Sequence, residues 1–340
     1  MRMFDILAKK RDGGELTAEE IAFWITGCVR REIPDYQTTA LLMAGRIRGF
    51  SLAETVEITN QMRYSGTVLN LETIPGIKAD KHSSGGVGDK TSLIVMPIVA
   101  AAGLKVAKLS GRGLGHTGGT VDKLESFAGF RGNLSSREFM QQITEIGMAI
   151  SGQSADLDPA DKILYGLRDV TATVDSIPLI AASIMSKKLA TGADILALDV
   201  KYGSGALLQD IAESRKLAQL MVQLAQSAGK KASALLTSMD QPLGCAVGNA
   251  LEMAEVGEVL QGGGSADLRQ LSLALAGELL WLAGVETNRG QACHTAEKLL
   301  DGGEPFHKLQ QMLAVQGGDS DFNHLPKANL VLPFCADEEG

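Results

Sequence analysis

The sequence from residue 81 to residue 92 reads KHSSGGVGDKTS, and an apolar helical pattern follows it directly. Its glycines tolerate positive φ angles and let main-chain N–H groups lie close to a ligand. The unpaired N–H groups at the start of a helix favour an anion. Lys81 adds a positive charge, and Ser83 and Ser92 add hydroxyl donors. The stretch therefore predicts a phosphate-binding loop at a helix amino terminus.

An ATP-type P-loop matches this stretch poorly, because Asp89 separates Gly88 from Lys90. A glycine-rich turn with incidental polar residues is the alternative that the residues leave open.

A second glycine-rich stretch, SGRGLGHTGGT at residues 110–120, follows a β-type run and contains GxGxxG at positions 113, 115 and 118. That motif alone is weak evidence for a dinucleotide. Here it does not open the sheet, and no acidic residue ends a following strand at a convincing spacing. Ser110 and Thr120 contribute hydroxyls. The two loops together therefore predict one shared anion.

The chain around these loops shows two kinds of pattern. Residues 1–65 are helical only, and Thr17 with Glu20, like Ser51 with Glu54, has capping-box spacing. From Gly76 onward, short β-type runs alternate with helical stretches. These runs are residues 106–109, 195–200 and 330–334. Such alternation predicts an α/β fold with a central, mostly parallel sheet.

Residues 161–189 look helical again, so the sequence predicts a split all-helical domain beside a larger α/β domain. The helical domain takes residues 1–66 and 161–190, and the α/β domain takes residues 76–152 and 194–335. The segments between them are rich in Gly, Asp, Pro or Thr and are predicted hinges. They are residues 66–76, 152–160 and 190–194.

The composition of the 340 residues is globular, with 45% hydrophobic and 21% charged residues. A balance of 32 Lys and Arg against 40 Asp and Glu gives a net charge of −8, which argues against a nucleic-acid polymer as partner. The longest apolar run, residues 93–104, is shorter than the ~20 residues of a membrane span. The four separated cysteines have no CxxC spacing, which indicates neither zinc nor disulfides and fits a cytoplasmic protein.

A third group of polar residues lies in the second helical segment. Tyr165 and Arg168 come first, and Ser183 and Lys187 follow four residues apart on one face of an otherwise apolar helix. Read by themselves, Ser183 and Lys187 fit a solvated helix end better than a binding site.

Four blocks of the sequence resemble the pyrimidine nucleoside phosphorylases, relatives of bacterial thymidine phosphorylase, over residues 1–335. The blocks are KHSSGGVGDK with TSL, SGRGLGHTGGTVDKLES, LRDVTATVDSIPLIAASIMSKKLA and QPLGCAVGNALE. The resemblance implies reversible phosphorolysis, in which a pyrimidine nucleoside and inorganic phosphate give the free base and an α-pentose 1-phosphate. Lys108 resembles the less selective branch, so the implied substrates are uridine, deoxyuridine and thymidine.

The same resemblance implies roles for residues in these blocks. The implied phosphate ligands are Lys81, Ser83, Ser92, Lys108, Ser110 and Thr120, together with the backbone of Leu109. The implied base ligands are Tyr165, Arg168, Ser183 and Lys187. His82, which would face O2 of the base, is an implied catalytic residue together with Arg168 and Lys187. Donors and cations of this kind stabilise the negative charge that leaves with the base.

A potassium ion is also implied, at positions that match Gly88, Leu243, Ala246 and Glu255. Lys90 stands where the family has a hydroxyl residue, so an ammonium group either takes the place of this ion or repels it. No organic cofactor is implied.

The family further implies a homodimer that forms through the helical domain. It also implies a hinge closure that brings the phosphate loops against the base ligands, and a C-terminal lobe beyond residue 340 that we expect to be absent here. Two alternatives stay open. One is an anthranilate phosphoribosyltransferase-like enzyme, which needs a diphosphate-and-magnesium site. The other, suggested by the missing lobe, is a non-catalytic dimer that binds phosphate or nucleoside.

Overall fold

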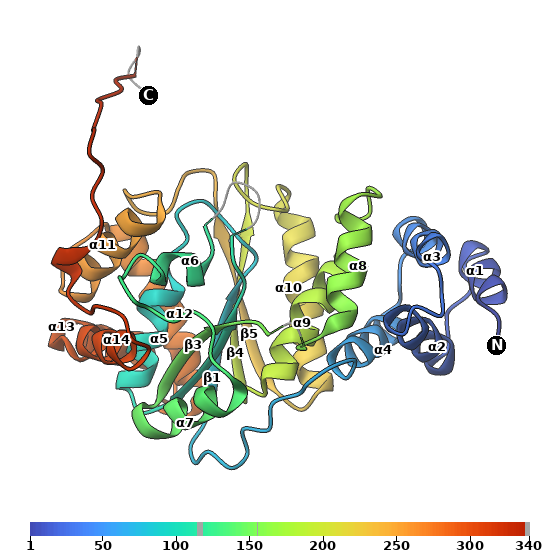
Figure 1. The fold of residues 1–340 in the computed structure, drawn as a ribbon, viewed down its shortest axis with the longest axis horizontal. Helices are drawn as coiled ribbons and strands as arrows, with labels where there is room; N and C mark the ends of the chain where they lie inside the picture. Colours follow the sequence, from blue (N-terminus) through green and yellow to red (C-terminus); the bar gives the residue numbers. More distant parts are fainter. Residues whose placement is uncertain (114–117, 155, 337–340) are drawn as a thin grey trace.

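The computed structural model describes residues 1–113, 118–154 and 156–336. Its centre is a five-stranded sheet whose paired strands are all parallel, in the order β3-β2-β1-β4-β5 (Figure 1). The strands are β1 (Lys78–Ser83), β2 (Lys105–Ser110), β3 (Met148–Gly152), β4 (Ile195–Tyr202) and β5 (Lys231–Ser238). The predicted α/β fold class with a parallel sheet is confirmed.

The strand order fixes where a ligand can bind. From β1 the chain builds outward to β2 and β3, and it then crosses to the other side of β1 to add β4 and β5. In open parallel sheets, ligands bind outside the carboxyl ends of the strands at such a reversal. Ser83 pairs with Asp199, and Ser110 pairs with Gly152, so these ends lie along one edge. The sheet therefore points to the loops that follow β1 and β2.

Helices cover both faces of the sheet. On one face lie α5 (Ser92–Ala101) and α12 (Ala266–Ala283), and their side chains pack with Val106, Ile150 and Ile195. The outer helices are α11 (Asn249–Leu260), α13 (Arg289–Gly302) and α14 (Glu304–Val315). The other face is covered by α7 (Ser136–Ile146), α9 (Ile177–Thr191) and α10 (Ile211–Ser227). Nearly every residue of α5 is buried, because it lies between the sheet and a second layer of helices.

The amino-terminal residues form an all-helical region with a core of its own. It comprises α1 (Met3–Arg11), α2 (Ala18–Val29), α3 (Asp35–Arg48), α4 (Leu52–Arg63) and α8 (Pro159–Asp169). The predicted capping boxes are present at the starts of α2 and α4. Trp24, Leu41 and Ile58 share this core with Leu164 of α8.

The helix α9 belongs to two cores at once. Leu179 and Ala182 pack in the helical core, whereas Met185 and Leu189 pack with strand β4 and helix α10. This helix therefore joins the helical region to the sheet, and the predicted division at residue 190 falls at its end.

The predicted strand at residues 330–334 is wrong. These residues continue in an irregular segment that leads away from the sheet (Figure 1). Leu332 is 74% exposed and Phe334 is 98% exposed. An apolar run forms a strand only where a neighbouring strand pairs with it, and within the described residues none lies beside this segment. No described helix is long and apolar enough to cross a membrane.

Candidate active site

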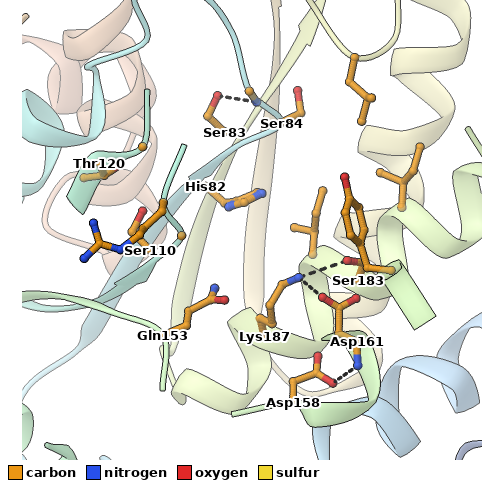
Figure 2. Close-up of a pocket in the computed structure, with 18 of the residues that line it drawn as sticks. His82, Ser83, Ser84, Ser110, Thr120, Gln153, Asp158, Asp161, Ser183 and Lys187 are labelled. Atoms are coloured by element: carbon orange, nitrogen blue, oxygen red, sulfur yellow. Dashed lines mark hydrogen bonds and ion pairs between the residues drawn. The ribbon is translucent and has the colours of Figure 1, made fainter. Parts of the chain in front are cut away.

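A cavity of about 800 Å³ lies at the carboxyl ends of β1 and β2, between the glycine loops and helices α8 and α9. Its size is within the ~300–1,000 Å³ typical of small-molecule sites. In the view of Figure 2, the hydroxyls of Ser83, Ser110 and Thr120 lie on one side, Lys187 on the other, and His82 between them. The cavity thus joins the two groups of residues that the sequence separates.

Five of the six predicted phosphate ligands line this cavity. They are Ser83, Ser92, Lys108, Ser110 and Thr120. Ser92 is the first residue of α5, whose amino-terminal end favours an anion. Gly85, with φ near 101°, has a conformation that favours glycine, and its N–H donates to Ser83 Oγ at 3.2 Å. Residues 114–117 of the second glycine stretch lie outside the described residues.

Lys81, the sixth predicted phosphate ligand, does not line the cavity. Its side chain is fully enclosed: Nζ donates to Thr91 Oγ1 at 2.6 Å and lies 3.2 Å from the Asp199 carboxylate. Successive residues of a strand point to opposite faces of the sheet. His82 therefore lies on the face toward α9 and the cavity, and Lys81 lies on the face toward α5.

Lys108 brings a weakly basic amine to the cavity. Burial, together with the charges of Lys188 and Lys81, lowers the pKa of Lys108 to about 7, although Asp80 opposes the shift. Its Nζ donates to Lys81 O at 2.6 Å, and Asp80 also pairs with Lys188 at 2.8 Å. A group with this pKa changes its charge near neutral pH.

His82 stays uncharged at neutral pH. Burial and the neighbouring ammonium groups, among them those of Lys188 and Lys108, lower the pKa of His82 well below its ordinary value. A neutral imidazole has one N–H donor and one acceptor nitrogen. His82 can therefore donate a hydrogen bond to a substrate oxygen without adding positive charge.

The four predicted base ligands all line the same cavity. Lys187 Nζ donates to the Asp161 carboxylate and, at 3.1 Å, to Ser183 Oγ. The guanidinium of Arg168 donates to the carbonyls of Thr173, Val174 and Leu179 at 3.3, 2.7 and 3.1 Å. The Tyr165 ring lies beside Arg168, with the guanidinium carbon 5.9 Å from the ring centroid. Both cations are thus held in fixed positions by the protein.

Two acidic cavity residues were missed by the sequence reasoning. Asp161 holds Lys187, and its place four residues before Tyr165 on α8 is a spacing that could have found it. Asp158 accepts hydrogen bonds from the Ser186 hydroxyl and from Asp161 N–H, the latter at 3.1 Å. Burial, helped by the charge of Asp161, raises the pKa of Asp158 to about 6. Nothing in the sequence pattern marks this shift.

The positions expected to hold potassium do meet in space, but they do not fit that ion. A Cβ on Gly88 would lie 2.7 Å from the carbonyl oxygen of Leu243. Lys90 Nζ donates to Leu243 O at 3.1 Å, to Ala246 O at 2.8 Å and to the Glu255 carboxylate. An ammonium group already fills the space between the oxygens that would coordinate potassium.

The family models show that this chain is a glycosyl transferase. Residues 76–306 match the family model described as the glycosyl transferase family, a/b domain, and residues 4–66 match its helical bundle domain. A crystal structure of anthranilate phosphoribosyltransferase from Thermus thermophilus superposes with a TM-score of 0.75. That comparison covers 91% of this chain and 98% of the other at 18% identity, and it therefore shows the fold alone.

Sequence comparison identifies a particular group within this class. A pyrimidine-nucleoside phosphorylase of Geobacillus stearothermophilus is 48% identical over 344 aligned positions, which span all of this chain and 79% of that protein. The pyrimidine-nucleoside phosphorylase of Bacillus subtilis is 46% identical with the same coverage. The chain belongs to the pyrimidine-nucleoside phosphorylase family.

Proposed function

We propose that this protein catalyses the reversible phosphorolysis of pyrimidine nucleosides, with uridine, deoxyuridine and thymidine as substrates. The observation that carries the proposal is that one cavity is lined both by the hydroxyls of the two glycine-rich loops and by Arg168 and Lys187. The match to pyrimidine-nucleoside phosphorylases over the whole of this chain supports this reaction.

The hydroxyl side of the cavity binds inorganic phosphate. Ser83, Ser92, Ser110 and Thr120 donate to its oxygens, and the amino terminus of α5 favours its charge. A phosphate oxygen then attacks the anomeric carbon of the sugar. The products are the pentose 1-phosphate and the free base, and no covalent enzyme intermediate forms.

The opposite side of the cavity receives the leaving base. The electron pair of the broken carbon–nitrogen bond moves into the pyrimidine ring, where it becomes negative charge on nitrogen and oxygen. Arg168 and Lys187 stabilise this charge, and His82 donates to O2. The two positioned cations contribute roughly 3 kcal/mol each, because they need no reorganisation when the charge develops.

The wider setting is part of the same proposal. We infer a homodimer through the helical region, because Phe4, Tyr36 and Ile47 of α1 and α3 are 69%, 74% and 70% exposed. Large apolar side chains exposed in this way are typical of interfaces. We place the protein in the cytoplasm, because its four cysteines are free thiols and two of them, Cys245 and Cys335, are exposed.

The test is the absorbance change when uridine, deoxyuridine or thymidine is mixed with enzyme and phosphate. We expect release of the base only with phosphate, and formation of a pentose 1-phosphate detectable by phosphorus NMR. Rates for the three nucleosides should lie within about a hundredfold, since a pocket that makes no dedicated hydrogen bond to the added methyl or hydroxyl discriminates by roughly this much. A folded protein that binds phosphate but releases no base at high enzyme concentration would establish the non-catalytic alternative.

A further inference from the structure

The loop between β1 and α5 contains a buried lysine that does not reach the cavity. The side chain of Lys90 is fully enclosed, and its Nζ is surrounded by oxygens of a distant part of the chain. It donates to the carbonyls of Leu243 and Ala246 at 3.1 and 2.8 Å and to the carboxylate of Glu255. A buried ammonium is favourable only where such partners replace water.

The surrounding oxygens are arranged as they would be around a bare cation. Two main-chain carbonyls and one carboxylate converge on a single point. The Glu255 carboxylate also accepts from Cys245 N at 2.8 Å and from Ser265 Oγ at 2.9 Å. Lys90 is the cationic partner of this hydrogen-bonded carboxylate.

Lys90 connects this pocket of oxygens to the phosphate-binding loop. Val87 O accepts from Leu243 N at 3.1 Å, so residues 87–90 are joined to residue 243 by the backbone as well as by the ammonium. Gly85, Gly86 and Asp89 of the same loop line the cavity. Ser92, two residues beyond Lys90, also lines it. Lys90 is thus one of the contacts that join the loop to residues 243 and 246.

We propose that Lys90 is a tethered replacement for a free monovalent cation, and that its ammonium positions the glycine loop for phosphate. An ammonium group carries the same charge as a potassium ion, has a similar radius, and donates hydrogen bonds where the ion would accept oxygen ligands. Because it is attached to the chain, it cannot dissociate. Lys90 is a positioning residue, since it touches neither phosphate nor base. Its effect on phosphate rests on the proposed function, whereas its replacement of a cation does not.

The first experiment measures how the unaltered protein responds to cations. Its thermal midpoint and its KM for phosphate are measured in potassium, sodium and tetramethylammonium chloride at equal ionic strength. We expect the same values in all three salts. A saturable effect of potassium, seen as a higher midpoint or a lower KM than in tetramethylammonium, would overturn the proposal. The midpoint needs no turnover, so this result is independent of the reaction.

The second experiment removes the ammonium with Lys90→Thr, which leaves space beside the three oxygens. In tetramethylammonium chloride we expect KM for phosphate to rise roughly tenfold, the lower end of the effect of removing a group that orients a binding site, with a smaller change in kcat. Potassium should restore KM and raise the thermal midpoint, each with the same half-saturating concentration. Loss of function that potassium does not repair would contradict the proposal.

Two further variants serve as controls. Lys90→Met fills the space without a charge, so it should lose phosphate affinity and gain nothing from potassium. Lys10→Thr removes another buried ammonium, which pairs with Glu54 at 2.7 Å in the helical region. It should lose stability equally in potassium and tetramethylammonium. If Lys90→Thr does not fold in any salt, the first experiment still tests the proposal, because it measures whether potassium affects the unaltered protein.

Discussion

The ammonium of Lys187 on α9 is paired with the carboxylate of Asp161 on α8, and both side chains line the cavity. The two residues are 26 positions apart in the sequence, and the helices that carry them pack together in the helical region. Lys187 is thus oriented before a substrate arrives, with Ser183 as its second partner. A cation held in this way can stabilise negative charge in the cavity without first changing its rotamer.

Asp161→Asn tests this orientation. The amide keeps the shape of the side chain and removes its charge, so Lys187 loses its ionic partner and its fixed position. We expect kcat to fall by about tenfold to a hundredfold, because small displacements of a reacting group have effects of this size. Steady-state kinetics with uridine would check this. An unchanged kcat would show that Asp161 does not orient Lys187.

Lys187→Ala tests the charge itself. Its partner charge develops only as the carbon–nitrogen bond breaks, so turnover should suffer much more than phosphate affinity. We expect kcat to fall about a hundredfold or more, with KM for phosphate nearly unchanged. Equal turnover of the variant and the unaltered enzyme would remove Lys187 from the mechanism.

His82→Ala should be milder. A neutral donor to O2 is worth a single hydrogen bond, and water can partly replace it, so we expect a loss of about tenfold in kcat/KM. Burial and the neighbouring ammonium groups lower the pKa of His82 well below its ordinary value, so the ring does not gain a proton near neutral pH. The pH profile of kcat/KM between about pH 6 and pH 8 should therefore have the same shape in the variant. A step in this range that the substitution abolishes would show that His82 titrates there.

Asp158→Asn should stabilise the fold in a pH-dependent way. The pKa of Asp158 is raised to about 6, so the folded state binds this proton more tightly than the unfolded chain does. Ionisation therefore costs stability as the pH rises from the unfolded value of about 3.9 through about 6. Asparagine never ionises, so the free energy of unfolding of the variant should be about 3 kcal/mol higher at pH 8 and little changed at pH 4. Urea unfolding at both pH values measures this, and a variant less stable at pH 8 would contradict it.

Ile47→Lys tests the inferred dimer. A charge on this exposed apolar face of α3 would have to be buried in the interface, so we expect monomers in analytical ultracentrifugation. Leu330→Lys is the matched control, since Leu330 is also exposed, at 72%, but lies in the irregular carboxyl-terminal segment. Should Ile47→Lys sediment like the unaltered protein, the dimer does not form through this face.

Much of the fold follows from patterns in the sequence, and the exceptions have physical causes. The capping boxes that start α2 and α4, and the apolar runs of β2 and β4, are local signals. Strand β1 has no such signal, because it reads KADKHS and buries charged residues that find partners only in the folded protein. Asp80, for example, pairs with Lys188 on a distant helix.

In the candidate site, too, some features could be predicted from the sequence and others depend on the folded structure. The glycine loops and their hydroxyls could be recognised from spacing, and the family resemblance added the base ligands. The sequence could not show that Lys81 points away from the cavity, because this depends on which face of β1 meets α5. It also left open whether Lys90 would take the place of a cation or repel it. That outcome depends on where the carbonyls of Leu243 and Ala246 lie in the folded chain.

Because α9 packs in two hydrophobic cores, it limits which segments of this chain can be exchanged with those of a relative. Residues 1–66 excised alone would lack the side chains of Leu164, Leu179 and Ala182 that complete their interior. A chimaera that exchanges only the amino-terminal helices would therefore join mismatched surfaces. The smallest transplantable unit includes α8 and α9, and with them the half of the cavity that carries Arg168 and Lys187.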